Sequence, residues 1–142
     1  MTTLKRFSLL PFVLGVALAG CKGEPTVLLE ETTVVSKDGY VSYTLSLEEG
    51  TEVETEVRVQ NDQPIDVLLI DASDLSVWED TTSAGIDVYT CCSTTGVKSK
   101  IYTFTAPKTG EFAVILNNGW RAFEGSLPSE KDADVYVKMT VR

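Results

Sequence analysis

Apolar and polar residues alternate with a period of two along most of the chain after residue 26. The apolar positions of three such stretches are Val41, Tyr43, Leu45 and Leu47; Val53, Val57 and Val59; and Val135, Val137, Met139 and Val141. Successive side chains of a β-strand point to opposite faces of its sheet. Each stretch therefore predicts a strand with one face in a core and the other in water.

The remaining apolar stretches predict further short strands and no helix. Residues 65–70 are apolar except at Asp66, which indicates a central strand, and residues 27–35, 101–106 and 112–116 predict three others. Long loops are expected over 72–96, with a short strand at 86–90, and over 119–132. Seven or eight short strands separated by turn residues predict an all-β fold, an antiparallel, jelly-roll-like β-sandwich over residues 26–142.

The first 21 residues have the pattern of an export signal. Lys5 and Arg6 form a positive start, residues 7–19 form an apolar run, and small residues precede Cys21. The run is too short to span the hydrocarbon core of a membrane as a helix, but it has signal-peptide length. We therefore expect a signal peptide over 1–20 and a short tether over 21–25.

The sequence Leu18-Ala19-Gly20-Cys21 resembles the lipobox of bacterial lipoproteins. That resemblance implies diacylglycerol on the Cys21 thiol, cleavage before Cys21 and usually acylation of the new amine. Two or three acyl chains anchor a protein almost irreversibly. Lys22, in place of an aspartate, implies the outer membrane in a Gram-negative host. The alternatives are an ordinary signal peptide with a chance cysteine, or an uncleaved anchor.

Charge and composition exclude several classes of function. The chain has 12 basic and 21 acidic residues, and because Lys5 and Arg6 precede the predicted cleavage point, the mature chain has ten basic residues and a net charge of −11. Such a surface disfavours nucleic-acid binding. The absence of histidine excludes Ser-His-Asp and Cys-His catalysis and every imidazole metal site. Composition leaves paired carboxylates for glycoside hydrolysis open, but a 122-residue sandwich offers little room for a cleft, so we expect no enzyme activity and no catalytic residue.

A second resemblance covers about residues 40–142. It rests on Asp66-Val67-Leu68-Leu69-Ile70-Asp71, on Ala106-Pro107-Lys108-Thr109-Gly110-Glu111-Phe112, and on the apolar strand that ends at Asn117-Asn118. This order resembles the bacterial pre-peptidase C-terminal domains and the related GOLD-type β-sandwiches. The resemblance implies a non-catalytic accessory module that binds polymers or proteins, or that assists secretion.

Cys91 and Cys92 are the most unusual pair in the mature chain. Adjacent Cα atoms lie about 3.8 Å apart, below the usual span of a disulfide, so a bridge between them would be strained and easily reduced. Two reduced thiols and an intermolecular bond are the alternatives. A vicinal bridge could serve a redox role or could simply clip the loop.

Two further groups of loop residues suggest ligands. Asp71, Asp74 and Asp80 could supply oxygen ligands to Ca²⁺, although no EF-hand spacing is present and solvated carboxylates are the simpler interpretation. Trp78, Trp120 and Phe123 could stack on a sugar or dock a partner, or they could cap the open end of the sandwich.

Together these features predict a non-enzymatic, lipid-anchored envelope protein that binds protein or glycan, with no required cofactor. The loops around Trp78 and Trp120 are its expected contact sites. The alternative is a redox-responsive envelope protein that uses Cys91 and Cys92. A purely structural role within a larger envelope complex is a third interpretation.

Overall fold

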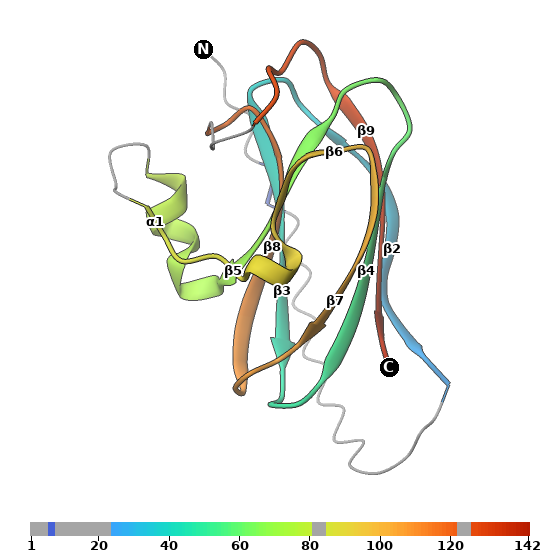
Figure 1. Ribbon diagram of the computed structural model, residues 1–142, viewed down its shortest axis with the longest axis vertical. Helices are drawn as coiled ribbons and strands as arrows, with labels where there is room; N and C mark the ends of the chain where they lie inside the picture. The colour runs from blue at the N-terminus through green and yellow to red at the C-terminus, as the bar shows by residue number, and fades with distance from the viewer. Residues whose placement is uncertain (1–5, 8–23, 81–84, 122–125) are drawn as a thin grey trace.

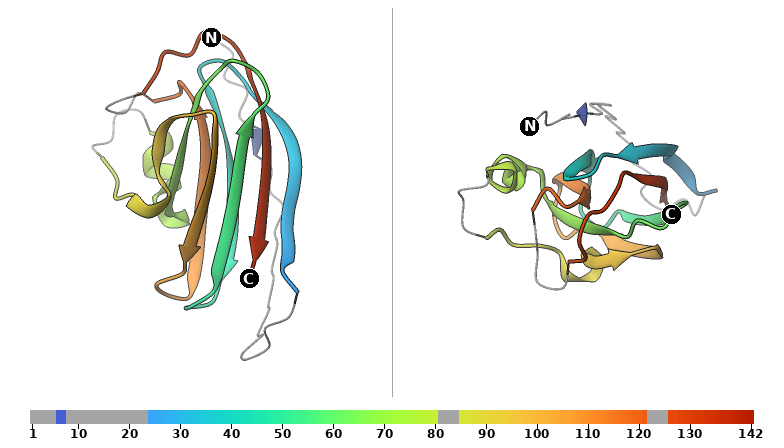
Figure 2. Two further views of the ribbon diagram at one scale, coloured as in Figure 1. Left: turned by 45° about the vertical axis from the view of Figure 1, so that its right-hand side comes forward. Right: turned by 90° about the horizontal axis from the view of Figure 1, so that it is seen from above.

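The computed structural model describes residues 6–7, 24–80, 85–121 and 126–142, and shows two β-sheets packed face to face (Figures 1 and 2). Sheet A has the order β1-β3-β8-β5-β6 and sheet B the order β2-β9-β4-β7. The strands are β1 (Arg6–Phe7), β2 (Thr26–Val35), β3 (Gly39–Leu47), β4 (Glu52–Val59), β5 (Ile65–Asp71), β6 (Thr94–Val97), β7 (Ser99–Thr105), β8 (Gly110–Asn118) and β9 (Ala133–Val141).

The connections confirm the predicted jelly-roll-like sandwich. Consecutive strands from β2 to β9 alternate between the two sheets, except that β5 and β6 are neighbours in sheet A. All pairings among these eight strands are antiparallel. β1 pairs in parallel with β3 and belongs to the predicted signal peptide, so β2 to β9 constitute the predicted mature domain.

The main core lies between the sheets and is built from the apolar halves of the alternating strands. Val53, Val57, Val135, Val137 and Met139 of sheet B are at most 1% exposed. They face the inward side chains of sheet A, including Phe112, Val114 and Leu116. Burial of these side chains is the main source of stability, since each contributes roughly 1.5–3 kcal/mol when fully buried.

A second, smaller apolar cluster covers the outer face of sheet A. The cluster combines strand residues with residues of the segment that follows β5: Tyr40, Leu68, Ile70, Trp78, Ala113 and Ile115 are buried, and Ala72, Leu75, Ile86, Val88 and Trp120 pack against them. Figure 1 shows the helix of this segment lying beside β5 and outside the sandwich.

The covering segment, of which the structure describes residues 72–80 and 85–89, differs from the long loop that the sequence predicts over 72–96. It contains the 3₁₀ turn η1 (Ala72–Asp74) and the helix α1 (Leu75–Glu79), and the 3₁₀ turn η2 (Thr90–Cys92) follows it. The predicted strand at 86–90 is wrong, and the strand of this region is β6 instead. The helix has only five residues, too few for a 3.6-residue period to show in the sequence.

The connections between strands define two ends of the sandwich. β2 starts at the near end, which we define by the turns between β3 and β4 and between β7 and β8. The distal end holds the turns around residues 36–38 and 60–64 and the loop between β8 and β9.

Within the described residues, no helix is long and apolar enough to cross a membrane.

Candidate functional site

The three aromatic residues proposed as ligand contacts lie in different surroundings. Trp78 lies in α1, not in a loop, and its side chain is fully buried. The ring of Tyr40 contacts Trp78 edge-on, with 4.8 Å between centroids, and lies 5.6 Å from the ring of Trp120. Trp120 is half-buried, and Phe123 lies outside the described residues. Trp78 therefore caps the outer face of sheet A and offers no ring to a ligand.

Polar contacts fix the middle of the covering segment and join its two ends. Tyr40 donates a 2.6 Å hydrogen bond to Glu79 Oε2, and burial together with this bond raises the pKa of the Tyr40 phenol far above its ordinary value of 10. Tyr89 donates a 2.6 Å hydrogen bond to Asp71 Oδ1, which joins the end of the covering segment to its start. These contacts hold the segment against sheet A.

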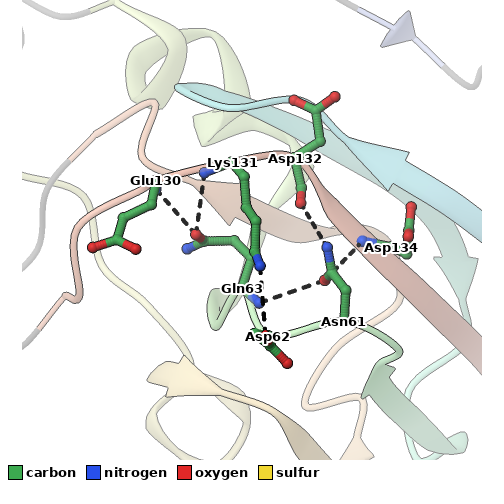
Figure 3. Close-up of polar contacts among 7 residues, drawn as sticks. All are labelled: Asn61, Asp62, Gln63, Glu130, Lys131, Asp132 and Asp134. Atoms are coloured by element: carbon green, nitrogen blue, oxygen red, sulfur yellow. Dashed lines mark hydrogen bonds and ion pairs between the residues drawn. The ribbon is translucent and has the colours of Figure 1, made fainter.

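At the distal end, a buried amide ties the loop before β9 to the turn before β5 (Figure 3). Gln63 is 2% exposed; its Oε1 accepts hydrogen bonds from the backbone N–H groups of Glu130 and Lys131, at 3.0 and 3.3 Å. Asn61 donates to the carbonyl oxygen of Asp132 at 2.8 Å. These side-chain hydrogen bonds fix the path of the loop relative to the turn between β4 and β5.

Two more buried polar side chains secure the same loop. Asn118 donates to the carbonyl oxygens of Val35 and Lys131, at 3.0 and 2.9 Å, and its Oδ1 accepts from Ser129. The carboxylate of Asp66 accepts from the Gly96 N–H and the Ser126 hydroxyl, at 3.1 and 2.6 Å. Because protein groups already satisfy these atoms, the network has a structural role.

The outer face of sheet B, in contrast, remains open to solvent. Strand register places its outward side chains in rows across the four strands: Val27, Glu30, Thr32 and Val34 of β2; Asp134, Tyr136, Lys138 and Thr140 of β9; Glu54, Glu56 and Arg58 of β4; and Ser99, Ile101 and Thr103 of β7. Val27, Val34 and Ile101 are large apolar residues that are 48%, 45% and 60% exposed. All the outward residues of these four strands are exposed or half-buried.

Tyr136 lies near the middle of this face and is held on two sides. Its hydroxyl donates a 2.7 Å hydrogen bond to Glu30, which raises the pKa of the phenol. The Arg58 guanidinium carbon lies 4.4 Å from the centre of the Tyr136 ring, and Arg58 Nε lies 3.0 Å from Glu56 Oε1. These contacts fix the positions of Tyr136 and Arg58 on the outer face of sheet B.

The structure gives one of the proposed calcium ligands, Asp71, other partners. Asp71 Oδ1 accepts from Tyr89, and Asp71 Oδ2 lies 2.9 Å from Lys108 Nζ; these bonds lower the pKa of the Asp71 carboxyl below 3.8, the Tyr89 bond most. In the described part of the chain, no three Asp, Glu or Cys side chains gather as metal ligands, and Asp71, Asp74 and Asp80 form no such group. A calcium site stays a prediction.

Cys91 and Cys92 are joined by a disulfide in η2. Cys91 is exposed, whereas Cys92 is 4% exposed and belongs to the main core. Cys21, the predicted lipidation site, lies outside the described residues.

Comparison with known proteins yields structural neighbours only. No family model matches this chain, and no curated protein does. The solved structures similar to it include two periplasmic inhibitors of g-type lysozyme, PliG. The one from Aeromonas hydrophila has 8% sequence identity and a TM-score of 0.46, and the match covers 80% of this chain and 85% of that chain. The one from Salmonella Typhimurium has 12% identity and a TM-score of 0.45, and the match covers 87% of this chain and 93% of that chain. The pre-peptidase C-terminal domain of a Bacillus anthracis collagenase is also similar, with 14% identity and a TM-score of 0.45, and the match covers 80% of this chain and 90% of that chain. Likeness at this level carries no argument about function.

The sequence did not single out the outer face of sheet B. The alternation of Glu54, Glu56 and Arg58 with buried valines showed that one side of β4 is wet. It did not show that β4 lies beside β9, which brings Arg58 to Tyr136. Strand order between sequence-distant elements is the missing information.

Proposed function

We propose that this chain is a non-enzymatic, lipid-anchored protein of the cell envelope, and that it binds a protein partner through the outer face of sheet B. The observation that carries the proposal is the contrast between the two outward sheet faces. One is sealed by the covering segment, and the other presents exposed apolar residues around Tyr136 and Arg58.

The anchor part of the proposal rests on the sequence that precedes the fold. The positive start, the apolar run and Leu18-Ala19-Gly20-Cys21 together favour lipidation of Cys21. Only residues 22–25 would separate Cys21 from β2, so the near end would lie toward the lipid and the distal end away from it. The outer membrane is the proposed location in a Gram-negative host, in line with Lys22.

A protein partner fits the outer face of sheet B better than a glycan does. An aromatic ring that stacks on a sugar needs an open face, but the Tyr136 ring is covered on one side by Arg58. Tyrosine and arginine are enriched in protein interfaces, and exposed aliphatic residues such as Val34 and Ile101 add apolar contact area. The acidic balance of the chain favours a partner with a basic contact surface.

Four exposed apolar residues allow a matched test of the binding face. Val34 and Ile101 lie on sheet B, Val77 lies on α1, and Leu127 lies in the distal loop; they are 45%, 60%, 39% and 53% exposed. A photo-crosslinking amino acid at each position, introduced into the full chain in its own cells, should capture the same partner from Val34 and Ile101. Capture from Val77 or Leu127 alone, or from no position, would contradict the proposed face.

The anchor has a separate test. Mass spectrometry of the membrane-extracted protein should find an N-terminal, acylated Cys21, and Cys21→Ser should release the protein from the membrane. An unmodified Cys21 with residues 1–20 still attached would refute the anchor without affecting the binding face.

A further inference from the structure

The disulfide between Cys91 and Cys92 joins a surface residue to a core residue. Cys91 is exposed, while Cys92 is 4% exposed and packs between the sheets. A thiolate that attacks a disulfide must reach one sulfur along the line of the bond, and access decides which sulfur it attacks. This difference in burial makes the two sulfurs chemically unequal, although they are adjacent in sequence.

The turn that carries the pair is fixed to the sandwich by bonds that do not involve sulfur. The Tyr89 N–H donates to the carbonyl oxygen of Leu69 at 2.9 Å, and the Leu69 N–H donates to Ser93 Oγ at 3.1 Å. The Cys92 N–H donates to the Tyr89 carbonyl oxygen at 3.0 Å. Residues on both sides of the pair are therefore bound to β5, so opening the sulfur–sulfur bond would leave the turn in place.

The core offers the buried sulfur both a partner and space. Cys92 Sγ lies 3.4 Å from the carbonyl oxygen of Thr103, which could accept a hydrogen bond from a Cys92 thiol. An apolar cavity of about 20 Å³, lined in part by Cys92, Leu69 and Tyr102, adjoins this position. When a disulfide opens, its sulfurs must move from bonding distance to van der Waals contact, and the cavity lies beside the sulfur that would move.

We propose that Cys91–Cys92 is a thiol–disulfide exchange site, in which the incoming thiolate attacks Cys91 Sγ and the buried Cys92 Sγ is the leaving group. The reaction partner is a dithiol, either a small molecule or a thiol–disulfide oxidoreductase. This site is independent of the binding face and the lipid anchor.

The exchange conserves atoms and electrons in two steps. A thiolate of the partner attacks Cys91 Sγ, forming a partner–Cys91 disulfide and breaking the Cys91–Cys92 bond; Cys92 Sγ leaves with the electron pair and takes a proton. The second partner thiol, as a thiolate, then attacks the partner's own sulfur in the mixed disulfide. The Cys91 thiolate leaves and is protonated. The partner dithiol is oxidised to a disulfide, and the Cys91–Cys92 pair is reduced to two thiols.

Glutathione, which has a single thiol, can show which of the two sulfurs is attacked. The full chain with Cys21→Ser, so that Cys91 and Cys92 are its only cysteines, is treated with reduced glutathione, alkylated and analysed by tandem mass spectrometry. We expect glutathione on Cys91 and the alkyl group on Cys92. Glutathione mainly on Cys92 would overturn the proposal. So would exchange that takes place only when enough denaturant is added to unfold the chain.

A pair of single-cysteine variants supplies the kinetic test in the same Cys21→Ser background. Cys92→Ala leaves only Cys91, and Cys91→Ala leaves only Cys92. In the native state the Cys91 thiol should react with an aromatic disulfide reagent more than about tenfold faster than the Cys92 thiol, because exposure governs access. In urea the two rates should converge. Equal native rates, with circular dichroism showing both variants folded, would refute the assigned roles.

Discussion

The outer faces of sheet A and sheet B have the same strand geometry but different surroundings. On sheet A, Leu68, Ile70 and Ile115 point away from the main core and are buried under Trp78 and its neighbours. On β4 and β9 of sheet B, the outward positions hold acidic residues, threonine, lysine, arginine and Tyr136, and they stay exposed or half-buried. The comparison shows that strand composition determines which face needs a cover.

The difference has a direct physical cause. β5 and β8 are apolar on both faces, so leaving the outer face of sheet A in water would expose several large side chains. The covering segment buries them, and its short helix α1 places Trp78 against them. β4 and β9 alternate strictly, and their outer face is soluble without a cover. That leaves it free for a partner.

The largest expected effect comes from removing the centre of the cover. Trp78→Ala deletes a fully buried indole and should lower the free energy of unfolding by about 3–5 kcal/mol. Tyr136→Ala, on the open face of sheet B, should cost less than about 1 kcal/mol. Urea unfolding followed by circular dichroism measures both changes, and similar losses would contradict the distinction between the faces.

A smaller loss is expected at Gly119, which lies just before Trp120. Gly119 has a φ of +87°, and a Cβ there would lie 2.7 Å from Ser129 Cβ. Gly119→Ala should therefore cost more than about 2 kcal/mol, combining left-handed strain with a steric clash. Gly50 has a φ of +85° but an open Cβ position, so Gly50→Ala isolates the strain, about 1–2 kcal/mol. Equal thermal shifts for the two variants would show that the contact with Ser129 does not matter.

The loop that carries Trp120 also depends on the buried amide of Gln63. Gln63→Ala leaves the Glu130 and Lys131 N–H groups without their acceptor and should cost about 1–3 kcal/mol. Amide hydrogen exchange should accelerate at Glu130 and Lys131 first. Unchanged protection there would mean that the network does not hold the loop. Asn61→Ala, in a more exposed part of the same network, is the control with the smaller effect.

The smallest effect concerns the clamp between Asp71 and Tyr89. Because the pKa of Asp71 is lowered in the folded state, its carboxylate stabilises the fold above pH 3.8, and this contribution is lost as the pH falls through the lowered value. Asp71→Asn should reduce stability at pH 7 by less than about 1 kcal/mol, with the difference from wild type vanishing at low pH.

The same pair has a second transition at high pH. Burial, followed by the hydrogen bond to Asp71, raises the pKa of Tyr89 to about 12, so its contribution is present below pH 10 and falls as the pH rises towards 12. The low-pH transition is tested by urea unfolding of wild type and Asp71→Asn at several pH values. A stability difference between them that did not change across pH 2–7 would exclude the Asp71 carboxylate as the stabilising group.

The sequence predicted the sandwich and nearly all of its strands, because period-two alternation survives in isolated stretches such as residues 53–59 and 135–141. It placed Trp78 in a loop because a five-residue helix has too few turns to show a period. It also missed the meeting of Arg58 and Tyr136, since that contact depends on the pairing of strands nearly 80 positions apart. Local pattern specifies strands, whereas sheet order depends on packing of the whole chain.

The affinity of the partner captured by crosslinking tests the central claim most directly. A lysine at each of two matched exposed apolar positions, Ile101→Lys on sheet B and Val77→Lys on α1, provides the comparison. If the outer face of sheet B binds a partner with a basic contact surface, Ile101→Lys should weaken binding at least about tenfold, and Val77→Lys should leave it unchanged. Binding that is weakened by Val77→Lys and not by Ile101→Lys would contradict the account.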